Sequence, residues 1–110
     1  MYYGITSSLV KRITSQGTCR RSSSINIMYL SDRQYRFSAV ISKKQGNAVE
    51  RNRVKRVIRE LMRLKKGIYP EGLYLIYYKG VCTGFCRQLV ESELDNMMKK
   101  ISKNKINSEP

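Results

Sequence analysis

Histidine and tryptophan are absent from this chain of 110 residues, and only 8 side chains are acidic. Without histidine the chain lacks the commonest general base and a frequent metal ligand, which argues against an enzyme that works alone. No stretch approaches the roughly 20 apolar residues that a membrane-spanning helix needs, so we expect no membrane partner. The first residues have neither the charged nor the apolar region of a secretory signal, and we expect a cytoplasmic protein.

Metal-binding side chains are few and poorly spaced. The chain has no histidine to complete a zinc set, and a Cys-x-x-x-Cys spacing is poor for one, so we expect reduced thiols at Cys19, Cys82 and Cys86. A metal ion would accept carboxylate ligands, but acidic residues are also ordinary in the first turns of a helix, which is where the sequence places Glu91, Glu93 and Asp95. We therefore assign no catalytic residue and no metal ligand to the polypeptide.

Positive charge dominates what the chain does contain. Its 22 lysine and arginine residues against 8 acidic ones give a formal net charge of +14. Such an excess attracts polyanions, and nucleic acid is the partner we expect. The length suits one domain, and no linker or repeat divides it. We expect residues 1–110 to form a single domain that is ordered over about 6–102, followed by a disordered tail at 103–110.

The most informative stretch is residues 43–60, which reads as the end of a strand, a tight turn and the start of a basic helix. Asn47 can cap this helix, and Glu50, three residues on, can reach back to complete a capping box. Gly67 suits the left-handed residue that follows a last helical turn. One helical face is apolar at the spacing of a buried stripe: Val54, Val57, Ile58, Leu61 and Leu64.

A second face of the same helix is cationic. Arginine pairs two phosphate oxygens and stacks on bases, and an asparagine amide can bond a phosphate or a base edge. Only Glu50 and Glu60 offset the basic residues nearby, which favours a polyanion contact over the alternative of an ordinary solvated face. The stripe consists of Arg51, Lys55, Arg59 and Arg63, with Arg56 beside it and Asn52 between two arginines.

The remaining segments predict a mixed α and β domain. Apolar spacing indicates helices over residues 6–16 and 85–101, and alternation indicates strands over 25–30, 35–42 and 72–78, with 18–24 either an edge strand or a loop. Turn residues at 31–34 favour a hairpin between the two strands that they join. The order α-β-β-β-α-β-α predicts a two-layer α+β domain, a mainly antiparallel sheet of about four strands packed with three helices.

The order Lys-Lys-x-Gly-Asn-Ala-Val-x-Arg-Asn-Arg-x-Lys-Arg-x-Ile-Arg-Glu at residues 43–60 resembles the signature of the bacterial ribonuclease P protein subunit. The resemblance implies an RNA-binding domain whose fold is shared with the second domain of the fifth small-subunit ribosomal protein. It also implies a left-handed β-α-β crossover, which runs against the usual handedness. The implied partners are a catalytic RNA and precursor tRNA. The catalytic RNA removes the 5′ leader of the precursor and uses Mg2+ that is bound mainly by the RNA. We expect no DNA partner.

The same resemblance implies two groups of site residues. The basic helix and its approach would contact the catalytic RNA through Lys43, Lys44, Arg51, Asn52, Arg53, Lys55, Arg56, Arg59 and Arg63. A cleft between the sheet and flanking helices would hold the 5′ leader through Val10, Thr14, Asn26, Met28 and Arg36, although ordinary packing explains these residues equally well.

Three other functions fit parts of the pattern. A structural RNA-binding protein of the ribosomal type would carry the same charge, and it would have no effect on cleavage. A DNA-binding regulator would need a short helix before its recognition helix and a dimerisation segment, and the sequence shows neither. A nuclease acting alone is disfavoured by the missing histidines. Tyrosines are suited to stacking on bases, but in strands they more often pack into the protein, and we expect core positions for Tyr69, Tyr74, Tyr77 and Tyr78.

Overall fold

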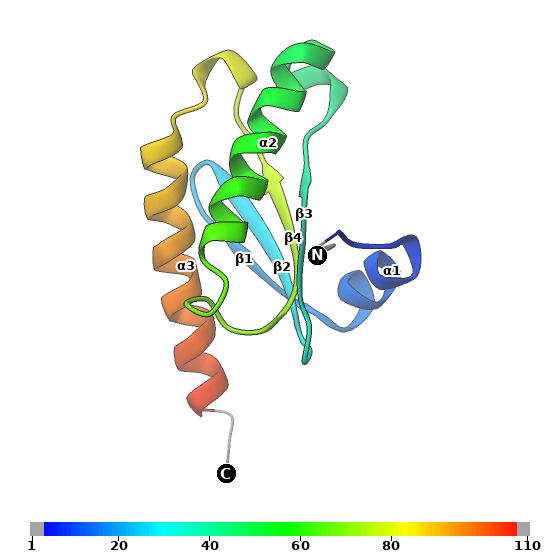
Figure 1. Cartoon of the computed structure of the whole chain (residues 1–110), viewed down its shortest axis with the longest axis vertical. Helices are drawn as coiled ribbons and strands as arrows, with labels where there is room; N and C mark the ends of the chain where they lie inside the picture. Colours follow the sequence, from blue (N-terminus) through cyan, green and yellow to red (C-terminus); the bar gives the residue numbers. More distant parts are fainter. Residues whose placement is uncertain (1–3, 108–110) are drawn as a thin grey trace.

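The structure, a computed structural model, describes residues 4–107, and of residues 102–107 the backbone only. Three helices pack around one sheet (Figure 1). The elements in chain order are α1 (Ser7–Gln16), β1 (Thr18–Arg21), β2 (Ile25–Ser31), β3 (Tyr35–Val40), the 3-10 turn η1 (Lys43–Gln45), α2 (Ala48–Leu64), β4 (Gly72–Tyr78), the 3-10 turn η2 (Cys82–Gly84) and α3 (Arg87–Asn107). The predicted order α-β-β-β-α-β-α is confirmed.

The sheet has the strand order β1-β2-β4-β3. β2 is antiparallel to β1 and to β4, whereas β3 runs parallel to β4, so that α2 lies in the connection between two parallel strands. The predicted hairpin of β2 with β3 is wrong, because β4 lies between them. β4 is buried along almost its whole length on both faces, which suits a central position in the sheet.

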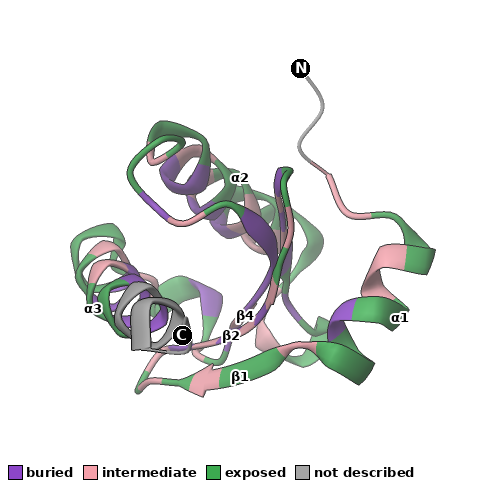
Figure 2. Ribbon diagram, turned by 90° about the horizontal axis from the view of Figure 1, so that it is seen from below, coloured by how far each residue is buried: buried purple, intermediate pink, exposed green. Residues whose placement is uncertain are grey.

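The two faces of the sheet are covered unequally. α2 and α3 pack on one face, and α1 covers part of the other (Figure 2). Alternation in β2 divides its side chains between the two faces: Ile25 and Ile27 join the large cluster under α2 and α3, whereas Met28 packs on the smaller cluster under α1. The sheet therefore presents an incompletely covered surface beside α1.

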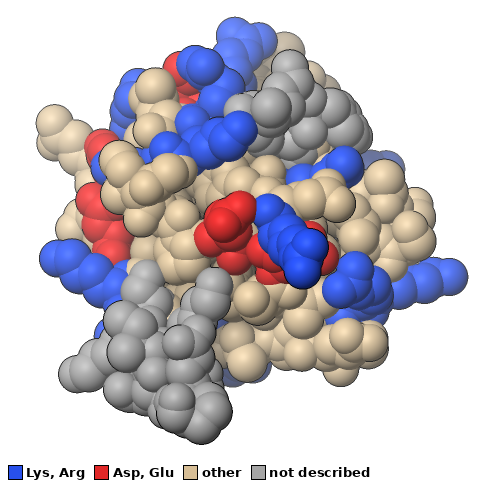
Figure 3. All heavy atoms as spheres, turned by 60° about the horizontal axis from the view of Figure 1, so that its bottom comes forward, with Lys and Arg blue, Asp and Glu red and all other residues tan. Residues whose placement is uncertain are grey.

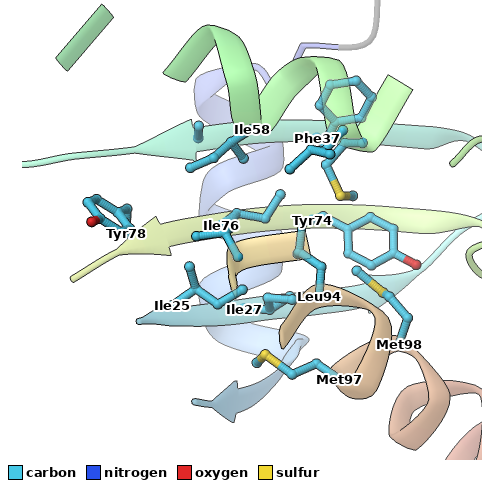
Figure 4. Packing of buried hydrophobic residues seen from close by; sticks show 14 of the residues in the cluster. Ile25, Ile27, Phe37, Ile58, Tyr74, Ile76, Tyr78, Leu94, Met97 and Met98 are labelled. Carbon is cyan, nitrogen blue, oxygen red and sulfur yellow. The ribbon is translucent and has the colours of Figure 1, made fainter. Parts of the chain in front are cut away.

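Aromatic side chains form part of the main core (Figure 4). The rings of Tyr29 and Tyr74 lie 4.9 Å apart between centroids. The Tyr29 hydroxyl donates to the carbonyl of Glu71 at 2.8 Å, and that of Tyr35 to the carbonyl of Met62 at 2.6 Å. Core positions are confirmed for three of the four tyrosines of the predicted cluster: Tyr69, Tyr74 and Tyr78.

Both long helices differ from expectation near their ends. Leu64, predicted on the buried stripe of α2, is 54% exposed at the last residue, and Met62 is buried in its place. Gly67, with φ of 86°, takes the left-handed conformation that the sequence predicts. α3 continues to Asn107, beyond the helix end predicted at residue 101, and neither proline nor glycine interrupts it. The disordered tail from residue 103 stays a prediction. Residues 108–110 lie outside the described part.

Candidate nucleic-acid interface

The start of α2 is fixed by a complete capping box. The Asn47 side-chain oxygen accepts the Glu50 N–H at 2.9 Å, and the Glu50 carboxylate accepts the Asn47 N–H at 3.0 Å, as predicted. Just before this cap, Gln45 donates its side-chain amide to the carbonyls of Tyr78 and Gly80 at 2.5 and 2.7 Å. These bonds tie the beginning of the basic helix to the end of the central strand.

The turn before α2 also packs closely on η2, where the backbone of Gly46 lies against Cys82. A side-chain carbon at Gly46 would lie 2.9 Å from Cβ of Cys82, so a larger residue there would force η2 or the helix start to move. Cys82 is fully buried, and burial raises the pKa of its thiol. Arg51 donates from Nε to the Gly46 carbonyl at 3.1 Å and thereby holds this turn. The first arginine of the predicted cationic stripe thus bonds to the backbone of the turn that precedes the helix.

The other residues of this cationic face lie next to β3, the edge strand of the sheet. Between α2 and β3 is a cleft of about 770 Å³. Its floor is Phe37 and Ser38 of β3, and its outer wall is Gly4 and Ile5, which precede α1. The wall from α2 consists of Asn52, Lys55, Arg56, Arg59, Glu60 and Arg63. Five of the nine predicted contact residues for catalytic RNA are brought together here.

Charge along the wall is uneven. Arg63 donates to both oxygens of Glu60, at 2.5 and 3.2 Å, and this hydrogen bond is the main reason that the pKa of the Glu60 carboxyl lies below its ordinary value. At the other end are Lys55, Arg56 and Arg59, and among the described lining residues Glu60 is the one acid. Figure 3 shows several lysine and arginine side chains at the upper edge of that view, over α2.

The other predicted contacts of this group lie outside the cleft. Lys43 and Lys44 are exposed on η1, and Arg53 is exposed near the start of α2. Because η1 is tied to the end of β4 through Gln45, these cations stand at the end of the sheet toward which β4 runs (Figure 1). They extend the positive surface beyond the cleft without lining it.

The second predicted group lies on the sheet face beside α1. Val10 and Met28 pack against the small cluster there. The Thr14 hydroxyl donates to the carbonyl of Val10 at 3.0 Å, within its own helix. Asn26 is half-buried, and its side-chain oxygen has no hydrogen-bond partner among the described residues. Val10, Met28 and, by its alternation with Met28 along β2, Asn26 lie on this face, whereas Thr14 is exposed on α1. Their contact with a leader stays a prediction.

The sequence prediction placed Tyr77 in the core, but this residue lies on the α1 face of the sheet. Tyr77 is half-buried and packs on the small cluster rather than in the main core. It pairs with Asn26 across β2 and β4, and with Val40 across β4 and β3. The signal was present in the sequence, because Tyr77 shares the parity of Leu73 and Leu75 along β4, opposite to that of the buried tyrosines.

Arg36, the fifth predicted contact of the leader, makes hydrogen bonds within the protein. It donates from Nε to the side-chain oxygen of Gln34 at 2.5 Å and from Nη1 to the carbonyl of Gly4 at 3.3 Å. It is half-buried, and its position along β3 places it on the α1 face. It therefore connects the strand edge to the segment that forms the outer wall of the cleft.

The acidic residues of α3 have protein partners. Asp95 accepts the Tyr69 hydroxyl at 2.5 Å and lies 3.6 Å from Nζ of Lys65, which is 3.4 Å from Glu91. Glu93 accepts the Ser24 N–H at 2.8 Å. Over the described residues, no three metal-binding side chains gather in a position to hold an ion. The same residues include no helix long and apolar enough to cross a membrane.

A small basic α+β protein with a cation-lined cleft at a strand edge belongs to the class of proteins that bind polyanions. The family model for ribonuclease P matches residues 6–102. The ribonuclease P protein component of Finegoldia magna is 35% identical over 80 residues, 72% of this chain and 71% of that protein. That of Nitratiruptor sp. is 32% identical over 79 residues, 72% of each. The chain belongs to the ribonuclease P protein family.

Solved structures agree with this assignment at the level of the fold. The RNase P protein of Staphylococcus aureus superposes with a TM-score of 0.78 at 23% identity, over 94% of this chain and 97% of that one. The RNase P protein from Thermotoga maritima gives a TM-score of 0.74 at 22% identity, over 83% of this chain and 89% of that one. The predicted fold class is confirmed.

Proposed function

We propose that this chain binds the catalytic RNA of ribonuclease P through the α2 cleft and assists removal of the 5′ leader from precursor tRNA. The observation that carries the proposal is the wall of α2, where Lys55, Arg56 and Arg59 face a cleft with Glu60 as the one acid among the described lining residues. Cations that line a hollow bind phosphates better than cations on a flat surface, because several of them can approach one strand at once. The family membership supports the same role in tRNA 5′ processing.

The polypeptide acts in this proposal by binding and charge neutralisation rather than by supplying a nucleophile. The RNA carries the chemistry, a phosphodiester hydrolysis for which Mg2+, bound mainly by the RNA, supplies an activated water and stabilises the leaving oxygen. The cations of α2 lower the repulsion between RNA phosphates that must approach one another. That lowers the concentration of Mg2+ at which the assembled RNA works.

The α1 face of the sheet is the proposed site of the 5′ leader. Unpaired RNA is held where bases can lie on apolar or aromatic side chains next to a polar group. Met28 and Tyr77 supply the first, and the unpartnered side-chain oxygen of Asn26 supplies the second. We place the protein in the cytoplasm, where precursor tRNA is processed in bacteria.

The test is cleavage of a precursor tRNA by a bacterial ribonuclease P RNA at low Mg2+, with and without the protein. We expect cleavage at the mature 5′ end that depends on the protein, and none with protein alone. Tight RNA binding with no gain in cleavage would instead support a structural role of the ribosomal-protein type. Cleavage by the protein alone would contradict both.

A paired charge variant ties the test to the cleft. Arg56→Gln with Arg59→Gln removes two cations from the wall, whereas Lys99→Gln with Lys100→Gln removes two exposed cations from α3. Removing one bond between a cation and a phosphate lowers the slope of log affinity against log salt by about 0.7 to 0.9. We expect the first pair to lower the slope by about 1.5 and the second to leave it nearly unchanged. Equal effects would refute the cleft as the RNA-binding surface.

A further inference from the structure

The outer wall of the α2 cleft is a short segment with no secondary structure, Gly4–Ile5. Two contacts fix it. The Gly4 carbonyl accepts a hydrogen bond from Nη1 of Arg36 at 3.3 Å. Ile5 is half-buried and packs against the small cluster under α1. Figure 2 shows the chain that leads into α1 passing beside the edge of the sheet. Together the two contacts hold the segment opposite α2.

Arg36 is poorly suited to binding a phosphate directly in this arrangement. Its Nε donates to Gln34 at 2.5 Å, so the fork that would grip two phosphate oxygens is partly engaged within the protein. It does not line the cleft, although its neighbours Phe37 and Ser38 form the floor. The cations that do face the cleft come from the opposite wall, on α2.

We infer that Arg36 is a positioning residue: by holding Gly4 against β3 it builds the wall that keeps an RNA strand against the cations of α2. This rests on the proposed function of the cleft and assigns to Arg36 a role other than contact with the leader. A cleft closed on two sides restricts the strand to one path along Lys55, Arg56 and Arg59. A cleft open on one side leaves the strand on a flat cationic surface, where each phosphate is bound more weakly.

A positioning arginine and an arginine that binds a phosphate directly respond differently to substitution. Removing an arginine that binds a phosphate directly weakens binding and lowers the salt slope, by about 0.7 per phosphate for a single strand. Removing a positioning hydrogen bond weakens binding while the same cations still meet the same phosphates. We therefore expect Arg36→Gln to reduce affinity about fivefold, the effect of one hydrogen bond, with the salt slope unchanged.

The experiment measures the dissociation constant of the full chain for a bacterial ribonuclease P RNA at several salt concentrations. The control for net charge is Arg33→Gln, an exposed arginine in the turn before β3 that lines no part of the cleft. Arg59→Gln gives the signature of a direct phosphate bond. Ile5→Ala loosens the wall through its second anchor and leaves Arg36 in place. Thermal unfolding of each variant checks that the fold persists.

The most direct test measures whether the effects of Arg36→Gln and Ile5→Ala on RNA affinity are independent. If Arg36 acts through the wall, the double variant Arg36→Gln with Ile5→Ala binds hardly more weakly than either single variant, because the wall is already released. Independent effects that multiply would overturn the inference. So would a salt slope that falls in Arg36→Gln as it does in Arg59→Gln.

The two proposals fail differently. An affinity that is unchanged in Arg36→Gln, beside a weakened Arg59→Gln, overturns the positioning role alone. If Arg59→Gln also binds normally and keeps its salt slope, the proposed function of the cleft is what fails.

Discussion

Replacing Gly46 by alanine tests how the basic helix is held in place. The φ of Gly46 is 167°, an extended conformation that any residue adopts, so the backbone itself does not require glycine. The constraint is steric. An added Cβ would lie 2.9 Å from Cβ of Cys82, 3.0 Å from Oε1 of Glu50 and 3.2 Å from Sγ of Cys82. Real Cβ atoms do not approach other heavy atoms at 2.9 Å, so η2 or the helix start must move.

The magnitude follows from which groups move. Cys82 is fully buried and its Cβ is fixed by the backbone, so the shift falls partly on Glu50, which accepts the Asn47 N–H in the capping box. Overpacking typically costs about 1–3 kcal/mol, and a damaged helix cap about 0.5–2 kcal/mol. We expect Gly46→Ala to lower the free energy of unfolding by about 2–4 kcal/mol. For a domain of this size that corresponds to a drop in Tm of roughly 10 to 25 °C.

Thermal and urea unfolding followed by circular dichroism measure the effect. The matched control is Gly84→Ala in η2, where an added Cβ would meet no atom within 4 Å and φ is not left-handed. The control is expected to keep the wild-type Tm within a few degrees, since surface substitutions usually change stability by less than about 0.5 kcal/mol. A Tm for Gly46→Ala within about 2 °C of the control would refute the packing of this turn on η2.

Three further substitutions probe other parts of the fold. Asn47→Ala removes one half of the capping box and should cost about 1 kcal/mol in urea unfolding; an unchanged midpoint would show that the cap contributes nothing. Gly67→Ala forces alanine to a φ of 86° in open space and should cost about 1–2 kcal/mol, with Gly67→Asn closer to wild type. Burial raises the pKa of Glu93, but hydrogen bonds from Ser22 and Ser24 outweigh it and hold that pKa below its ordinary value. The stabilisation is therefore complete at neutral pH and is lost as pH falls through the folded-state pKa, so Glu93→Gln should flatten the acid side of the stability profile; an equally steep profile would contradict this.

Local signals in the sequence predicted the elements and the helix start well. The capping box at Asn47, the left-handed Gly67 and the alternation of β2 all depend on residues near one another in the chain, where propensity and hydrogen bonding act directly. Pairing partners do not depend on such neighbours. The turn residues between β2 and β3 fit a hairpin, yet β4 pairs with both strands because its apolar side chains on both faces need burial on both sides.

Side-chain roles were harder to predict than positions. Arg51 has the spacing of the cationic stripe, but its bond to the Gly46 carbonyl depends on the turn geometry. Leu89 has an apolar side chain within the predicted helix, yet it is 50% exposed, whereas its neighbour Val90 is buried in the core. The outer wall at Gly4 and Ile5 could not be predicted at all, since it depends on where the chain passes before α1 begins.

The central place of β4 has a consequence for how the chain folds. β4 follows both of its partner strands in the chain, and Ile25 at the start of β2 pairs with Tyr78 at the end of β4. Until β4 docks, β2 lacks a partner on one edge and β3 has none. Contacts between residues so distant in sequence slow folding, because the loop must close before the pairing is gained. We therefore expect refolding to be limited by the docking of β4 between β2 and β3.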